Sequence, residues 1–102
     1  DFIRYIPELG YLIEREEYFG LLQANGKLIL PVSFSNIKLF ENAYFLVSID
    51  EKFGLFLKDG KEILPIQYER IQRFDQDSFV LFQGGVMTYY FPKTHSFISL
   101  AE

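Results

Sequence analysis

The sequence predicts an all-β fold, built from tandem β-hairpins stacked as an open twisted array, with a small propeller-like ring as the alternative. Three observations predict it. A motif recurs every 34 residues, turn-forming pairs separate short apolar runs, and no stretch keeps a helical period over a dozen residues. Hydrophobic residues make up 49% of the 102 residues and charged residues 24%, which is typical of a folded chain rather than a disordered one.

The repeat is carried by ten identities, without a gap, between residues 19–40 and residues 53–74. A third copy keeps the apolar positions but has Thr88, Thr94 and Ser99 where the second copy has two glycines and a proline. Terminal units of repeat arrays are often atypical. We therefore expect one domain of three 34-residue β-repeats over residues 1–102, with the best-formed units at about 11–44 and 45–78 and a degenerate third unit at 79–102.

Turn residues locate a hairpin in each of the first two units. Asn25-Gly26 and Asp59-Gly60 lie between apolar runs, and such pairs indicate two-residue type I′ turns, which need a positive φ at both central residues. The prolines at 31 and 65 are expected to end the second strand, because proline cannot donate a ladder hydrogen bond.

Registering each hairpin on its turn pairs apolar residues on both faces in every copy. The expected pairs are Leu22 with Ile29, Leu21 with Leu30, Phe56 with Ile63, Leu55 with Leu64, Tyr90 with Phe97, and Tyr89 with Ile98. Adjacent pairs point to opposite faces. Both faces of each hairpin must therefore be covered, which stacking against neighbouring copies provides.

Another strand is expected at residues 45–49, repeated at 79–83 and 11–15. Between this strand and the preceding hairpin, apolar residues recur at every third position, as at Tyr68, Ile71 and Phe74. That spacing fits neither a strand nor a long helix, and it favours an ordered loop or a short 3₁₀ turn.

The second copy contains an aromatic-glycine pair, an Asp-Gly-Lys turn, an Ile-Leu-Pro segment and a Tyr-Glu-x-Ile-x-x-Phe motif. This combination resembles the WG repeat, and the departure from it is that Phe19, Phe53 and Met87 stand in place of the tryptophan. The resemblance implies arrays of β-hairpins in a larger bacterial protein, with no established catalytic residues. The turn and motif positions are Phe19, Gly20, Gly26, Pro31, Phe53, Gly54, Gly60 and Pro65.

Composition and motifs weigh against several classes of function. The net charge of -4 and the absence of a basic run disfavour a nucleic-acid partner, and no apolar run is long enough to span a membrane. The chain has no cysteine and a single histidine, His95, so we expect no metal, no cofactor and no enzyme activity. We interpret Asp75 and Asp77 as part of a solvated loop rather than a Ca²⁺ site, and Gly84-Gly85 as a turn rather than a phosphate cradle. The sequence does not indicate a compartment.

Four tyrosines are the candidate contacts for a protein or peptide partner: Tyr18, Tyr44, Tyr89 and Tyr90. Exposed aromatic residues are favoured at interfaces, although filling of the core is a competing interpretation. The function expected from these observations is a non-catalytic β-repeat module for protein or peptide binding or scaffolding. The alternatives are a purely structural repeat segment, whose partners are neighbouring repeats of the same chain, and a carbohydrate-binding unit.

Overall fold

The computed structural model describes residues 2–100. In that range every regular element is a β-strand. The strands are β1 (Phe2–Ile6), β2 (Gly10–Arg15), β3 (Tyr18–Leu22), β4 (Leu28–Phe34), β5 (Asn36–Phe40), β6 (Tyr44–Ile49), β7 (Lys52–Leu57), β8 (Glu62–Tyr68), β9 (Arg70–Asp75), β10 (Ser78–Gln83), β11 (Val86–Phe91) and β12 (Ser96–Leu100).

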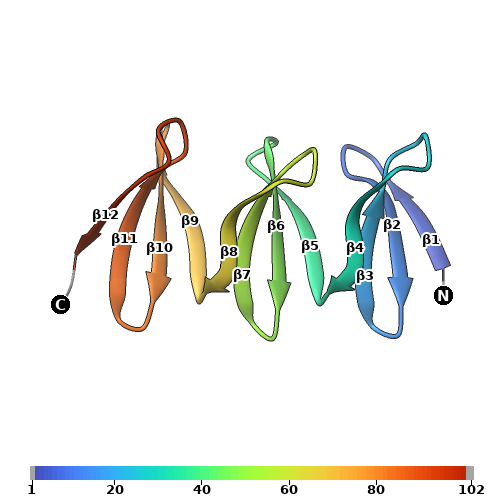
Figure 1. Ribbon diagram of the computed structural model, residues 1–102, viewed down its shortest axis with the longest axis horizontal. Coiled ribbons are helices and arrows are strands. Elements are labelled where there is room, and N and C mark those ends of the chain that lie inside the picture. The colour runs from blue at the N-terminus through green and yellow to red at the C-terminus, as the bar shows by residue number, and fades with distance from the viewer. Residues whose placement is uncertain (1, 101–102) are drawn as a thin grey trace. The chain divides into compact units, whose positions relative to one another are not determined.

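The strands form three four-stranded antiparallel sheets, β1–β4, β5–β8 and β9–β12, in which strands consecutive in sequence lie side by side (Figure 1). None of the sheets is closed into a barrel. The prediction of an all-β repeat fold is confirmed. The strands expected at residues 11–15, 45–49 and 79–83 are β2, β6 and β10, and each is the second strand of its sheet.

The segments with apolar residues at every third position are strands and not loops or 3₁₀ turns, so that prediction was wrong. β5 and β9 begin directly after a bend at Ser35 and Glu69. The Ser35 N–H donates to the Ser48 carbonyl (2.7 Å), and the Glu69 N–H donates to the Phe82 carbonyl (2.8 Å). Because the bend inserts a residue between two strands, it interrupts the two-residue alternation, and Phe34 and Ile37 are both buried although three positions apart.

The type I′ turns occur in a different hairpin from the one predicted. At Asp59-Gly60 only the glycine has a positive φ, of 96°, and the Leu57 N–H donates to the Lys61 carbonyl (2.8 Å) across a three-residue loop. This is a type I turn closed by a glycine bulge. Both central φ values are positive at the tight turn that joins the second and third strands of each sheet: Glu16-Glu17, Asp50-Glu51 and Gly84-Gly85.

The different turn shifts the register close to the loop. Leu21 pairs with Leu30 as predicted, but Leu22 pairs with Leu28 and not with Ile29. In the third sheet both expected pairs are present, Tyr90 with Phe97 and Tyr89 with Ile98.

The prolines do not end their strands, contrary to the prediction. Pro31 lies inside β4 and Pro65 inside β8, and both residues are exposed. Since β4 and β8 are edge strands, a residue without an N–H costs no ladder bond when that position faces away from the neighbouring strand.

Gly20 in β3 and Gly54 in β7 let the fourth strand of each sheet, β4 or β8, pass close to the third strand. A Cβ on Gly20 would lie 2.8 Å from the Val32 nitrogen, and one on Gly54 would lie 2.9 Å from the Leu64 carbonyl oxygen. The register of β3 and β4 shifts between Phe19 and Leu21, at the first of these glycines. Close approach of backbone excludes any side chain at these two positions.

The chain divides into two compact units, residues 1–66 and residues 67–102, and the boundary falls inside β8. In the first unit, one cluster joins Leu12, Leu21, Leu30 and Phe34 of the first sheet to Ile37, Phe45 and Val47 of the second. The prediction of a single domain with units at 11–44, 45–78 and 79–102 stays a prediction. The sheets themselves follow another phase of the same period and begin at β1, β5 and β9.

Candidate functional site

Each sheet has two faces, which the cross-strand register distinguishes. In the second sheet we call the face that carries Ile37, Val47 and Phe45 the leading face, and the opposite face the trailing face. In the first and third sheets the leading face is the one that carries the residues 34 positions before or after these. In the first sheet the row Leu12, Leu21 and Leu30 belongs to the trailing face. The cluster between the first two sheets is therefore a trailing face packed on a leading face.

This packing excludes solvent where it occurs. Leu21, Leu30 and Val47 are each 0% exposed, and Ile37 is 5% exposed. The Phe34 ring, from the first sheet, meets the Phe56 ring of the second sheet edge-to-face at a centroid distance of 5.8 Å. Aromatic pairs in this geometry add to the stabilisation from area burial alone.

The leading face of the first sheet carries the same kind of residue without such cover. Ile3 stands 34 positions before Ile37 and pairs with Ile13, as Ile37 pairs with Val47. Ile3 is nevertheless 59% exposed, and Tyr5, on the same face, is 60% exposed. Tyr18 adds a third side chain to this face at 49% exposure. This face is therefore mainly apolar and aromatic, with Arg15 beside Tyr18 at one end, and part of its surface is uncovered.

The trailing face of the third sheet shows the reciprocal situation. Ile98 is in register with Tyr89 and Val80, as Leu30 is with Leu21 and Leu12. In this row Val80 is buried and Tyr89 is half-buried, whereas Ile98 is 54% exposed at the position where Leu30 is fully buried. Phe74 packs edge-to-face on Tyr89, with ring centroids 5.0 Å apart, and is itself 58% exposed.

The four candidate tyrosines do not gather into one site. Tyr18 lies on the leading face of the first sheet and Tyr89 on the trailing face of the third. Tyr44 is a half-buried residue at the start of β6. Tyr90 is 1% exposed, so its burial removes it from any contact surface.

Tyr90 is the centre of an aromatic cluster in the third sheet. Its ring lies 4.9 Å from the Phe97 ring and 6.4 Å from the Phe79 ring. The Tyr90 hydroxyl and the His95 Nδ1 are 3.0 Å apart and share a hydrogen bond. His95 has a positive φ of 52° and occupies the turn between β11 and β12. The single histidine thus satisfies a buried phenol.

The acidic residues near the β9–β10 turn stabilise that turn. The Ser78 hydroxyl donates to the Asp75 carboxylate (2.7 Å), and the Asp77 N–H donates to the same oxygen (2.9 Å). The hydrogen bond from Ser78, followed by that from Asp77, lowers the pKa of Asp75 below its usual range. Within residues 2–100 no group of three or more histidine or acidic side chains gathers at metal-binding distance.

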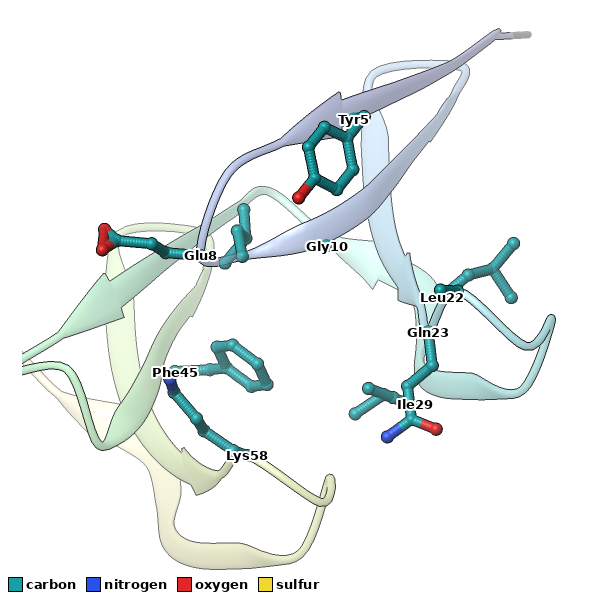
Figure 2. A pocket seen from close by; sticks show the side chains of 10 residues that line it. Tyr5, Glu8, Gly10, Leu22, Gln23, Ile29, Phe45 and Lys58 are labelled. Carbon is teal, nitrogen blue, oxygen red and sulfur yellow. The ribbon is translucent and has the colours of Figure 1, made fainter.

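A cleft of about 380 Å³ opens between the turns of the first two sheets. Figure 2 shows Tyr5 on one side of it, Phe45 with Lys58 on a second side, and Leu22, Gln23 and Ile29 on a third. The Glu8 carboxylate points away from the cavity. The lining combines apolar and aromatic side chains with the polar Gln23, and Lys58 adds a cation.

Gly10 lines this cleft at a position where the later repeats have larger residues. It has a φ of 119°, and a Cβ here would meet the Leu22 carbonyl oxygen at 3.1 Å. The residues at the same position of the later repeats are Tyr44 and Ser78. The first repeat therefore lacks a side chain at a point where the second repeat has a large aromatic one.

Comparison with known families accounts for the repeat. The family described as the WG containing repeat matches residues 19–53 and 54–83, well over half of the chain. The chain belongs to the WG-containing repeat family. No curated protein and no solved structure matches it.

The three residues that replace the tryptophan of the WG repeat take one structural position. Phe19, Phe53 and Met87 are each the second residue of the third strand of their sheet, and each is half-buried. In the first two WG repeats a glycine without room for a Cβ follows, whereas Thr88 follows Met87. The aromatic-glycine pair thus combines a packing residue with a backbone approach.

No signal in the sequence distinguishes Ile3 from Ile37, or Ile98 from Leu30. Ile3 and Ile37 take one position of the 34-residue repeat, Leu30 and Ile98 take another, and all four are aliphatic. Their exposure differs because only some of them have a sheet packed against them, and that difference became visible with the structure.

No helix in the described residues has the length and apolarity that crossing a membrane requires.

Proposed function

We propose that this chain is a non-catalytic β-repeat module that binds a protein partner on the uncovered faces of its first and third sheets. The observation that carries the proposal is the exposure of Ile3 (59%) and Ile98 (54%), at positions where Ile37 and Leu30 are buried. Large exposed apolar patches on soluble proteins commonly mark interaction surfaces.

The chemistry of the two faces favours a protein over the other candidates. Tyr5 and Tyr18 offer rigid aromatic surface with a polar tip, a composition enriched at protein interfaces. The net charge of -4 disfavours a nucleic acid, which would need counterion release by basic side chains. The Ser78 hydroxyl donates to Asp75, and His95 shares a hydrogen bond with Tyr90, so these polar side chains hold a turn and an aromatic cluster of the third sheet.

Site-specific photocrosslinking tests the proposal. A photoreactive phenylalanine analogue is placed at Tyr5, on the uncovered leading face, or at Phe2, which is similarly exposed but points to the opposite side of β1. After irradiation in a cell extract, we expect a crosslinked protein from the Tyr5 position and none from the Phe2 position.

Competition makes the crosslink specific. An excess of the unlabelled chain should suppress it, and the same excess of an Ile3→Glu chain should not, because a carboxylate on an apolar face must be desolvated on docking. Equal crosslinking from both positions, or equal suppression by both competitors, would refute the proposal.

A further inference from the structure

The packing between the first and second sheets defines how one repeat docks on another. The trailing face of the first sheet supplies Leu21, Leu30 and Phe34, and the leading face of the second supplies Ile37 and Val47. The two faces are not alike, so the contact is heterologous and has a direction.

One chain carries a partly uncovered copy of each half of that contact, with Ile3 and Ile98 as its exposed aliphatic residues. On the first sheet, Ile3 and Ile13 stand where Ile37 and Val47 stand on the second. On the third sheet, Tyr89 and Ile98 stand where Leu21 and Leu30 stand on the first. A leading face and a trailing face of matching type are therefore both available to a second molecule.

We infer that the occupant of these faces is a second copy of this chain, which docks head to tail with its leading face on the trailing face of the first copy. This inference rests on the proposed function and names the partner. Ile3 and Ile13 of one molecule would cover Tyr89 and Ile98 of the next, as Ile37 and Val47 cover Leu21 and Leu30 within the chain.

The side chains around the two patches suit this contact. The Tyr5 and Tyr11 rings contact each other on the leading face, with centroids 5.2 Å apart and planes tilted by 55°. No charged residue lies in the rows that contain them and Ile3. On the trailing face, the Arg70 guanidinium lies 4.5 Å from the centre of the Phe82 ring. A guanidinium on an apolar face favours aromatic partners, which the tyrosines supply.

A heterologous contact between identical molecules does not close on itself unless the rotation completes a ring. The purified chain should therefore form species beyond the dimer as its concentration rises. We expect the weight-average mass in analytical ultracentrifugation to climb above twice 12.0 kDa between about 10 µM and about 1 mM, the range of weak specific contacts.

Two variants, each with one face blocked, provide the decisive experiment. Ile3→Glu blocks the leading face and Ile98→Glu the trailing face, and both residues are exposed, so both variants should fold. Each alone should have no competent pair of faces and should remain a monomer, with self-association weakened at least about tenfold. An equimolar mixture retains one intact leading face and one intact trailing face, and it should form a dimer of 1:1 composition and nothing larger.

Phe2→Glu and Ser99→Glu are the matched controls. They introduce the same charge at exposed neighbours whose side chains point to the opposite side of the same strands. Both should associate as the unmodified chain does. Far-ultraviolet circular dichroism on every variant, with Ile3→Thr and Ile98→Thr as milder substitutions, shows that any lost association reflects the face and not the fold.

Each remaining outcome overturns the inference. A chain that stays monomeric at about 1 mM, blocked variants that still associate, controls that lose association equally, or a mixture without a dimer would each do so. If the purified chain is monomeric but the extract still yields a crosslink from Tyr5 that Ile3→Glu fails to compete, the proposed function stands and the partner is another protein.

Discussion

The first and second sheets have nearly the same repeat sequence and differ in what covers their faces. In both sheets a glycine of the third strand lies against the backbone of the fourth strand, and a glycine bulge closes the loop between these two strands. In both, an isoleucine is the second residue of the first strand. Yet Ile3 is 59% exposed and Ile37 is 5% exposed. The comparison teaches that the repeat determines local geometry, while the neighbouring sheet determines burial and therefore stability.

Truncation of the two isoleucines tests this comparison most severely. Ile37→Ala should destabilise the chain by about 3 kcal/mol, because it leaves a cavity in a closed cluster. Ile3→Ala should cost less than about 0.5 kcal/mol, as for most exposed positions. Urea unfolding followed by circular dichroism, at a concentration where the chain is monomeric, measures both. Equal losses would mean that Ile3 is covered as closely as Ile37 and would contradict the comparison.

Substitutions of Gly20 and Gly54 should reduce the free energy of unfolding by similar amounts, because backbone atoms of the fourth strand lie close to both. A Cβ at Gly20 or Gly54 would approach a backbone atom within 2.9 Å, closer than side-chain carbons pack. Gly20→Ala and Gly54→Ala should each destabilise by about 2 kcal/mol through displaced backbone. Gly26→Ala is the control: it has no atom within 4 Å of the new Cβ and is penalised only by its φ of 88°. A smaller loss at Gly54 than at Gly26 would contradict this explanation.

The tight turns offer a gain in stability. Glu16 and Glu17 hold φ values of 51° and 71°, where residues other than glycine are strained, and the third repeat has Gly84-Gly85 at the same place. Glu17→Gly should stabilise the chain by about 1 kcal/mol. Gly85→Glu should destabilise it by a similar amount. Unfolding midpoints that move in the same direction for both variants would exclude backbone strain as the cause.

These same turns show how far the sequence could be interpreted. Asn25-Gly26 and Asp59-Gly60 located a hairpin correctly, because any glycine that accepts a positive φ permits a reversal. They did not reveal the loop type, because a type I turn with a glycine bulge uses the same residues as a type I′ turn. The actual type I′ turns contain Glu16-Glu17 and Asp50-Glu51, pairs with no turn signature.

The repeat period and the strand positions were predictable because they follow from alternation and recurrence along one chain. The candidate site was less so. Of the four tyrosines selected as candidates, Tyr18 and Tyr89 lie on the two uncovered faces, while Tyr90 is buried by Phe79 and Phe97. Exposure depends on which sheet packs on which face, and a residue's own identity does not encode that neighbour.

The smallest predicted effect concerns a turn that differs between the second and third sheets. The β5–β6 turn has Glu41 at φ 55°, whereas its counterpart in the β9–β10 turn is Asp75, whose carboxylate accepts hydrogen bonds from Ser78 and Asp77. These bonds lower the pKa of Asp75 relative to that of an aspartate in the unfolded chain, which is about 3.9. The folded state therefore binds the proton less readily, so the stabilisation is complete above the unfolded pKa and is lost as the pH falls through the folded one.

Asp75→Asn should accordingly lower the unfolding midpoint slightly at pH 7, and the difference from the unmodified chain should shrink as the pH falls below about 4. Because Asp75 lies at the surface, solvent screening limits the effect, and thermal midpoints at several pH values are the appropriate measurement. A difference that grows on acidification would mean that the ionised Asp75 destabilises the turn and that its hydrogen bonds do not hold the loop.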